Sequence, residues 1–583
     1  MAEHPVKVVV TGSIPVPAGG MEGWPKGKGA YKIILSGLPK PFTAIYLIIQ
    51  EGYVFVCSNH TPSTNSKLCR KQKWGIIMGF MDNLKNVLLE RKAVTENGAL
   101  GYASTGKALV DLNFAVASLR NESEEEIVKK FVKAYYEDKV LAMQWLFFLR
   151  DIRGGLGERR SFRIIFNYLA SGERKMMERL LPLVAEYGRF DDLLCLLGTP
   201  IEENVLVLIK KQVNSDMEAM LKKEQVSLCA KWLPSINASS AETRNTAKKV
   251  AKYFGITAKE YRQMLAGLRE YLKVTEVLVS SGRWDSIVYE HVPSNANLLY
   301  RNAFMKHDGE RRQAYLDGLV KDKAKINTGT LMPHEIVLSY TVMQSRWSLR
   351  MGAYDETLEL LWKNLDDTVQ GAENVLCVVD GSGSMTCNVG NSSLTALHVS
   401  NALGIYFAER LKGPYKDKFI TFSSKPEYVD LGSCNSLKEK LELAFSHDDC
   451  TNTNIKSTFD LVLQTAVENN LAQEELPGTI LIISDMEFDY AVTCKDRETL
   501  FENIHKQFKA HGYKLPRLVF WNCNSRTGAI PVKVNELGVG LVSGFSVNVC
   551  KMVLSGRLDP YSCLREQLDN KRYEPVRAAV QGI

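Results

Sequence analysis

Residues 376–386 read LCVVDGSGSMT, in which a hydrophobic run ends in an aspartate and two serines follow, each beside a glycine. Such a run is typical of a buried strand, and the glycines allow a tight backbone turn directly after it. Asp380, Ser382 and Ser384 then present one carboxylate and two hydroxyls toward a single point. The stretch therefore predicts a strand whose carboxyl end carries a cluster of oxygen ligands.

The rest of residues 370–583 alternates short β-rich runs with helical stretches. The later runs are KFITFS, GTILIISD, PRLVFWNC and GVGLVSGF, and a helical stretch between the first two strands is SSLTALHVSNALGIYFAERLKG. This alternation predicts a doubly wound, Rossmann-like α/β domain built on a parallel sheet with helices on both faces. In such sheets the functional crevice lies beyond the carboxyl ends of the strands.

Three of the loops at this predicted crevice carry hard oxygen ligands. The first holds Asp380 and the two serines, and the strand TILIIS ends at Asp485. Between them, the loop DDCTNTNIKS offers Thr451 or Thr453 just before a helix. A few carboxylates with several hydroxyls suit a magnesium ion, with water completing its octahedral shell. The alternative is a solvated Gly-Ser turn that holds no ion.

These residues resemble the metal-ion-dependent adhesion site of von Willebrand factor A domains, whose pattern is D-x-S-x-S, then a threonine, then an aspartate. In that family a small residue and an apolar residue follow the threonine by five and six positions. Thr458 and Phe459 follow Thr453 in this way, so Thr453 is favoured over Thr451. The direct matches to the rest of the pattern are Asp380, Ser382, Ser384 and Asp485.

The resemblance implies a bound divalent cation, either Mg²⁺ or another such as Mn²⁺ or Ca²⁺. It also implies an open position on the ion for a carboxylate of an acidic partner protein, or for a phosphate oxygen. The family uses this site for adhesion and assembly. We therefore expect binding and no catalysis.

Enzymatic alternatives lack the residues that they need. Phosphatases of the haloacid dehalogenase type require a second aspartate two residues after the first, where this chain has Ser382. A phosphate-binding GK[ST] loop is absent from the sequence. The glycine-rich stretch GGLGERRS at residues 154–161 follows a predicted helix and lacks the Lys-Ser pair. It is interpreted as a turn between two helices.

Residues 79–365 read as a succession of amphipathic helices. In EEEIVKKFVKAYYEDKVLAMQWLFFLRDI, which is residues 124–152, apolar residues recur at i, i+3, i+4 and i+7. Similar runs follow, and GG, GTP and WLPS separate them. Many short helices without strands predict a HEAT-like α-solenoid or ring with no strict repeat period.

A helical array followed by an A domain resembles the Ro autoantigen family, which is built on the TROVE module. LFFLRDIRGGLGERRSFRIIFNYL, KWLPS and KINTGTLMPHEIV are similar to stretches of its bacterial and viral relatives, and the resemblance covers roughly residues 79–583. It implies a helical ring joined by the A domain, and binding of noncoding or single-stranded RNA. The candidates for RNA contact are Arg150, Arg153, Arg159, Arg160, Arg163, Lys325, Asn327 and His334.

Each RNA candidate also has a structural interpretation. The arginines of RDIRGGLGERR could pair with Asp151 and Glu158 at a capped helix end. Asn327 lies where a helix entry is expected, and His334 suits a cap or a core position. The charge is only mildly favourable for a nucleic-acid binder, because residues 81–350 carry 41 Lys and Arg against 33 Asp and Glu.

Composition sets the remaining bounds. The 583 residues carry a net charge of +7 and are 45% hydrophobic, which predicts a globular protein of two or three domains. Residues 351–583 carry 23 basic against 30 acidic residues, so the two parts suit different partners. No run reaches the roughly 18 apolar residues of a membrane span. The twelve scattered cysteines lack zinc-site spacing and favour free thiols in the cytoplasm. A monomer is expected.

Residues 1–78 are rich in Gly and Pro and are interpreted either as a poorly ordered N-terminal extension or as the product of an incorrect start site. The run FTAIYLIIQEGYVFV predicts a hairpin around Glu51-Gly52. The stretch after it suggests that the main module begins at Met78 or Met81. Two functions remain open for that module. One is a Ro-like RNA-binding scaffold, and the other is a metal-dependent protein-interaction module without RNA binding.

Overall fold

The computed structural model divides the chain into two compact units, Met1–Arg91 and Lys92–Ile583. In the first unit it describes four strands, β1 (Lys7–Ile14), β2 (Ala30–Ser36), β3 (Ala44–Gln50) and β4 (Tyr53–Ser58). The described residues of the second unit are 92–345, 348–422, 425–448, 450–489, 500–531, 539–554 and 559–582.

The strands of the first unit form an antiparallel sheet in the order β1-β2-β3-β4. Strands β3 and β4 pair from Ile45 opposite Ser58 to Gln50 opposite Tyr53. The hairpin predicted around Glu51-Gly52 is therefore confirmed. The proposed module start at Met78 or Met81 lies outside the described residues.

The second unit begins with a short hairpin and continues with helices. The hairpin consists of β5 (Lys92–Val94) and β6 (Leu100–Tyr102). The α-helices that follow are α2 (Ala108–Phe114), α3 (Glu124–Glu137), α4 (Lys139–Arg150), α5 (Arg160–Ala170), α6 (Arg174–Leu180), α7 (Val184–Tyr187), α8 (Glu202–Leu221), α9 (Cys229–Trp232), α10 (Ala241–Phe254), α11 (Ala258–Tyr271), α12 (Thr275–Ser280), α13 (Ser294–His307), α14 (Gly309–Val320), α15 (Pro333–Tyr340) and α16 (Glu356–Lys363). Short 3₁₀ turns lie among them: η1 (Ser118–Arg120), η2 (Leu181–Leu183), η3 (Phe190–Leu196), η4 (Trp284–Ser286) and η5 (Tyr289–His291).

Local sequence signals set the ends of many of these helices. Helix α3 begins after Ser123, whose hydroxyl accepts a hydrogen bond from the Glu126 backbone N–H. Helix α10 ends at Gly255, which has a φ of 76° that glycine adopts without steric cost. The stretch at 154–161 is a turn from α4 into α5, as predicted. The prediction of a region without strands is wrong at β5–β6, and also at β7 (Thr341–Ser345) and β8 (Ser348–Met351).

A six-stranded sheet forms the core of the carboxyl-terminal part, in the order β11-β10-β9-β12-β13-β14. Its strands are β9 (Val375–Asp380), β10 (Lys418–Phe422), β11 (Pro426–Asp430), β12 (Thr479–Ser484), β13 (Arg517–Asn522) and β14 (Val539–Ser543). All neighbours pair in parallel except β10 and β11, which are antiparallel. Every strand predicted from the sequence is present, whereas β11 was not predicted.

Helices cover both faces of this sheet. Alternate residues of β9 enter different cores: Cys377 and Val379 pack with Phe407 of α17, whereas Val378 packs with Phe459 of α19. The helices of this part are α17 (Ala396–Arg410), α18 (Leu437–Ser446), α19 (Ile455–Glu468), α20 (Leu500–Ala510), α21 (Cys550–Leu554), α22 (Pro560–Leu568) and α23 (Glu574–Gln581). Its 3₁₀ turns are η6 (Gly383–Thr386), η7 (Gly413–Tyr415), η8 (Gln473–Glu475), η9 (Val547–Val549) and η10 (Lys571–Tyr573).

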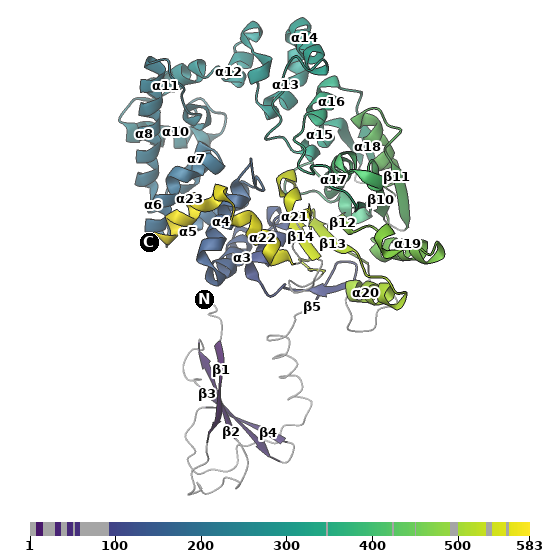
Figure 1. The fold of residues 1–583 in the computed structure, drawn as a ribbon. Coiled ribbons are helices and arrows are strands. Elements are labelled where there is room, and N and C mark those ends of the chain that lie inside the picture. Colours follow the sequence, from purple (N-terminus) through teal and green to yellow (C-terminus); the bar gives the residue numbers. More distant parts are fainter. Residues whose placement is uncertain are drawn as a thin grey trace. The chain divides into compact units, whose positions relative to one another are not determined.

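The helical region closes onto the α/β part at both of its ends (Figure 1). Near its start, the Ala117 N–H after α2 donates to the Ser543 hydroxyl at the end of β14 (3.0 Å). Near its end, α15 packs against α17. The terminal helix α23 returns to α4 and α6. Both ends of the helical region therefore contact the α/β part.

A charged contact reinforces this return of the chain terminus. Arg572, in η10 just before α23, pairs with the buried Asp151 through two guanidinium nitrogens, one of them at 2.8 Å. The Tyr573 hydroxyl donates to the same carboxylate at 3.0 Å. Among the described residues, no helix is both long enough and apolar enough to cross a membrane.

Candidate metal site and basic groove

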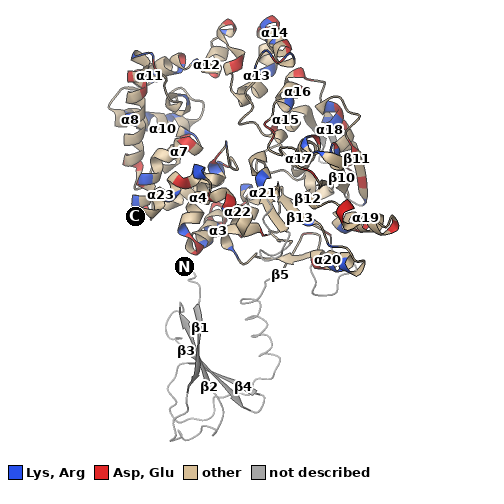
Figure 2. Ribbon diagram, viewed as in Figure 1, with Lys and Arg blue, Asp and Glu red and all other residues tan. Residues whose placement is uncertain are grey.

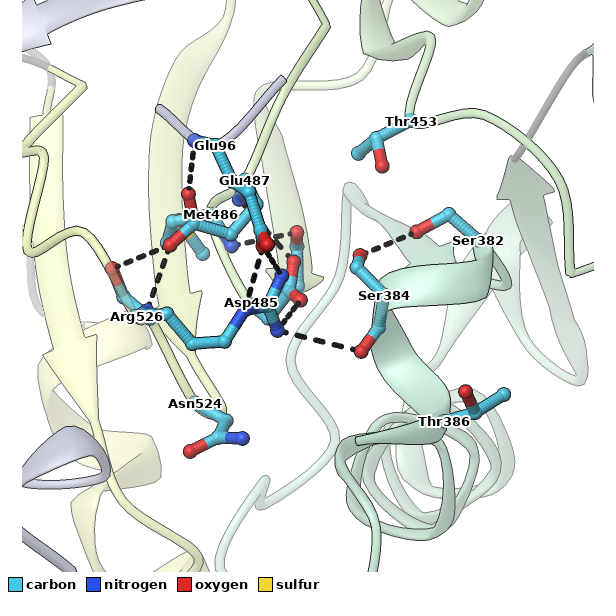
Figure 3. Close-up of polar contacts among 12 residues, drawn as sticks. Glu96, Ser382, Ser384, Thr386, Thr453, Asp485, Met486, Glu487, Asn524 and Arg526 are labelled. Atoms are coloured by element: carbon cyan, nitrogen blue, oxygen red, sulfur yellow. Dashed lines mark hydrogen bonds and ion pairs between the residues drawn. The ribbon is translucent and has the colours of Figure 1, made fainter. Parts of the chain in front are cut away.

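The predicted metal residues meet where the sheet reverses its strand order. Strands β9 and β12 are neighbours, and the chain leaves them toward opposite edges. Asp380 ends β9, and Asp485 follows β12. Ser382 directly precedes η6, and Ser384 lies within it. Thr453 comes from the loop before α19. Figure 3 shows the two serines and Thr453 facing the side on which Asp485 lies. This switch point is where open α/β sheets bind ligands.

Hydrogen bonds fix the first part of the site. The Ser382 N–H donates to Asp380 Oδ1 (2.9 Å), and the Ser484 hydroxyl donates to Asp380 Oδ2 (2.5 Å). The hydroxyls of Ser382 and Ser384 lie 3.1 Å apart. The Gly383 N–H donates to the carbonyl of Thr451 (2.9 Å), while the side chain of Thr453 is buried beside the site. Thr451 contributes its backbone carbonyl to this turn, and the Thr453 hydroxyl accepts a hydrogen bond from the Asn97 amide (3.2 Å).

The two carboxylates are held in an environment that disfavours two negative charges. Asp380 and Asp485 are both fully buried. Burial and the nearby Asp485 raise the pKa of Asp380 to about 7, although hydrogen bonds from Ser382 and Ser484 act in the opposite direction. Burial also raises the pKa of Asp485, against the influence of Arg526.

These donors fit a hard divalent cation. Two carboxylates and three hydroxyls around one point match the oxygen ligands that Mg²⁺ takes, with room for water in its shell. A second positive charge would also relieve the buried pair of carboxylates. Among the described residues, no group of three or more His, Cys, Asp or Glu side chains forms a metal cluster. The proposed site instead combines two carboxylates with the hydroxyls of serine and threonine.

Residues that the sequence interpretation missed surround the site. Arg526, in the loop after β13, donates through Nη1 to Asp485 Oδ2 (3.0 Å). Glu487 is fully buried and accepts from the backbone N–H groups of Arg526 (2.7 Å), Thr527 (2.9 Å) and Glu96 (2.7 Å). The position of Arg526 just beyond a predicted strand end was a usable signal. Nothing in the sequence placed Glu96 here.

The RNA candidates of the α4–α5 turn fall into two groups. Arg150 is 2% exposed and pairs with the buried Asp192 at 2.7 Å, and Arg163 pairs with the same carboxylate at 2.7 Å. Arg160 donates to the carbonyls of Leu119 and Glu122 (3.1 and 3.0 Å). Arg150 and Arg163 therefore brace the fold. Arg153, Arg159 and Arg160 are exposed, although Arg153 also donates to the carbonyl of Glu186 (3.2 Å).

The prediction that the side chains of these arginines pair with Asp151 and Glu158 is wrong. Glu158 pairs with Arg120 at 2.6 Å, a residue 38 positions earlier. Asp151 pairs with Arg572, close to the carboxyl terminus. Both acidic residues thus join distant segments, which local sequence spacing does not indicate.

The candidates of the segment before α15 are mostly occupied within the fold. Asn327 donates through its amide to the carbonyls of Glu290 (2.8 Å) and Val292 (3.0 Å). His334 is buried with its ring 5.3 Å from that of Phe545, and burial lowers its pKa to about 3. The core interpretation of His334 is therefore confirmed. Lys325 is exposed.

A groove of about 940 Å³ lies beside the α4–α5 turn and combines cationic with aromatic side chains. The guanidinium of Arg189 lies 3.9 Å from the centre of the Trp232 ring. Arg153, Lys223 and Tyr271 also line the groove. Elsewhere in the second unit, Lys and Arg are interspersed with Asp and Glu along the helices (Figure 2). The groove therefore combines cations and aromatic rings with two carboxylates, those of Glu186 and Glu224.

Comparison with known proteins identifies the family. Uncharacterized protein L728 of Acanthamoeba polyphaga mimivirus is 32% identical over 522 residues, which cover 83% of this chain and 88% of that protein. The chain belongs to the family of this mimivirus protein. Two domains of unknown function match as well, DUF2828 at residues 237–374 and DUF7788 at residues 374–577. Their shared boundary falls directly before β9.

The fold was also compared with solved structures. The crystal structure of the Deinococcus radiodurans RO (RSR) protein aligns with 78% of this chain and 93% of its own. The two share 14% sequence identity at a TM-score of 0.39.

Proposed function

We propose that this protein is a divalent-cation-dependent binding protein. In this proposal its α/β part is a von Willebrand factor A-like domain that accepts an acidic group of a partner protein. The observation that carries the proposal is the convergence of Asp380, Ser382, Ser384, Thr453 and Asp485 at the switch point of the sheet. The strand order, with a single antiparallel edge strand, supports it.

The residues have distinct roles in this proposal. Asp380 and Asp485 would supply the negative charge that attracts the ion, and the three hydroxyls would supply neutral oxygens. A bound Mg²⁺, Mn²⁺ or Ca²⁺ supplies a net positive charge with an open position for a partner's carboxylate. Ser484 and the Ser382 backbone orient Asp380 before the ion arrives. We propose no catalytic step, because Ser382 stands where a phosphatase would need its second aspartate.

Binding of Mn²⁺, followed by electron paramagnetic resonance, tests this proposal. The variant Ser382→Ala/Ser384→Ala should bind Mn²⁺ at least about tenfold more weakly, because two of the five ligands are lost while the sheet keeps its core. Ser239→Ala, an exposed serine of the helical part, is the matched control. Equal Mn²⁺ affinity of the double variant and the wild type would refute the site.

The groove favours a second function, binding of noncoding or single-stranded RNA by a Ro-like scaffold. Cations neutralise phosphates and aromatic rings stack on bases, and both are present at Arg153, Arg189, Trp232 and Tyr271. The exposed Arg159 and Lys325 remain candidates outside the groove. None of the nine cysteines that the structure describes between residues 92 and 582 is disulfide-bonded, which supports a cytoplasmic setting.

Anisotropy with a labelled 12-nucleotide oligouridylate tests RNA binding. Trp232→Leu and Arg153→Ala should each weaken binding severalfold, and EDTA should leave it unchanged because the groove contains no predicted metal ligand. Arg174→Ala, a 62% exposed arginine elsewhere, is the control. Binding that is absent at low salt, or equal in all variants, would leave the metal-dependent function alone.

A further inference from the structure

The β5–β6 hairpin lies against the proposed metal site. Its turn is anchored to the segment after Asp485, because Gly98 forms a bridge with Asp489 and the Thr95 hydroxyl donates to the Phe488 carbonyl (2.6 Å). The Tyr102 N–H also donates to the Ile530 carbonyl (2.7 Å). A segment at the start of the second unit is thus fixed beside residues almost 400 positions later.

Glu96, in this turn, is the exposed end of a chain of charges. Its carboxylate accepts from Arg526 Nε at 2.7 Å and also from Nη2. The same guanidinium donates through Nη1 to Asp485 (3.0 Å), as Figure 3 shows. The side chains of Glu96, Arg526 and Asp485 are 57%, 26% and 0% exposed. Arg526 therefore joins a predicted metal ligand to a carboxylate at the surface.

The neighbouring Asn97 touches another predicted ligand. Its amide donates to the Thr453 hydroxyl (3.2 Å) and to the Glu487 carbonyl (2.7 Å). The Glu96 side chain, in contrast, is held by Arg526 alone in the described contacts, while its backbone N–H is bound to Glu487. The side chain can therefore swing away without loss of the turn's backbone contacts.

We propose that Arg526 is a second anion-binding group of this site and that Glu96 is its internal occupant. An acidic side chain of a partner protein displaces Glu96 and pairs with Arg526 while its other oxygen faces the ion. This inference rests on the proposed metal-dependent function. The Arg526–Asp485 contact is buried and persists, whereas the Glu96 pair is exposed and breaks at low cost.

The magnitude follows from the exposure of the Glu96 pair. An exposed ion pair favours its paired state over its unpaired state by a factor of about 4. Because Glu96 then leaves Arg526 free in only about one fifth of the molecules, it lowers the affinity for an external carboxylate about fivefold. Removal of the Glu96 charge should restore this factor. It should do so only while Arg526 is present, because Arg526 is the group for which the two carboxylates compete.

A fluorescein-labelled hexaglutamate peptide, titrated in saturating Mg²⁺ and followed by anisotropy, tests the inference. The full chain with Glu96→Gln should bind the peptide about fivefold more tightly than the wild type. In an Arg526→Gln background, Glu96→Gln should change nothing. Glu310→Gln, which removes an exposed carboxylate of α14, should behave as the wild type. Thermal melting of each variant confirms that it is folded.

The outcomes separate this inference from the function on which it rests. Magnesium-dependent peptide binding that is lost in Asp380→Ala, but is not tightened by Glu96→Gln, overturns the role of Glu96 and keeps the metal site. If Glu96→Gln binds Mn²⁺ but binds no peptide, the role of Glu96 is likewise overturned and the metal site is kept. Peptide binding that is indifferent to both Mg²⁺ and Asp380→Ala overturns the proposed function, and this inference with it.

Discussion

Replacement of Asp380 by asparagine should stabilise the protein when no divalent ion is present. The pKa of this carboxyl is raised to about 7 by burial and by Asp485, from an ordinary value of 3.8. Because the pKa of Asp380 is higher in the folded than in the unfolded state, the contribution of this carboxyl to stability is fully present below about pH 3.8. It is lost as the pH rises toward 7. Asparagine keeps the shape of the side chain and removes the charge.

The size of the effect follows from the shift. A shift of about three pKa units at 1.36 kcal/mol each means that the charged Asp380 lowers the free energy of unfolding by at most about 4 kcal/mol at pH 8. The Ser484 hydroxyl must turn to accept from the new amide, so we expect a gain of about 2–4 kcal/mol in the free energy of unfolding. The gain should shrink as the pH approaches 4.

Urea unfolding in EDTA, from pH 4.5 to pH 8, measures this difference. A second series in Mg²⁺ should cancel or reverse this difference, because an ion at a thousand times its dissociation constant adds about 4.1 kcal/mol to the wild type only. Asp285→Asn, an exposed aspartate, is the control. If Asp380→Asn is less stable than the wild type in EDTA at pH 8, the carboxylate is already satisfied and the reasoning fails.

Two further predictions concern the rest of the fold. Arg572→Gln should lower the free energy of unfolding in urea by about 3 kcal/mol, because it leaves the buried Asp151 without its cation. The control Arg577→Gln, at an exposed ion pair, should lower it by less than about 1 kcal/mol. Equal losses in the two variants would contradict the role of Arg572 in bracing the fold. Burial lowers the pKa of His334 to about 3 and of His398 to about 4, so the stability that neutral histidines provide is complete above about pH 6.5 and falls below it. At pH 5, His334→Gln should remove about 2 kcal/mol of the acid-induced fall in the free energy of unfolding. A variant whose stability depends on pH in the same way as that of the wild type would contradict this.

The strand ends were predictable because local patterns encode them. Hydrophobic runs that stop at an aspartate or an asparagine mark the strands, and parallel pairing then brings Asp380 and Asp485 to one edge. Strand β11 was missed because PEYVD is short, begins with proline and lies at the edge of the sheet, where polar residues are tolerated. The meeting of Asp380 and Asp485 at one edge could therefore be inferred from the sequence, whereas their assignment as metal ligands comes from the resemblance to von Willebrand factor A domains and stays a proposal.

Contacts between distant segments could not be inferred in the same way. Arg572 reaches Asp151 across 421 positions, and Arg526 reaches Glu96 across 430. Each pair depends on the tertiary structure of the second unit, which local sequence periodicity does not indicate. For the same reason Arg150 and Arg163 looked like surface cations, although Asp192 binds both inside the fold.

Anomalous diffraction from crystals grown with Mn²⁺ tests the metal site most directly. The account predicts one anomalous peak within bonding distance of the hydroxyls of Ser382, Ser384 and Thr453, beside Asp380 and Asp485. Diffraction from crystals at saturating Mn²⁺ that shows no peak at this edge of the sheet would contradict it.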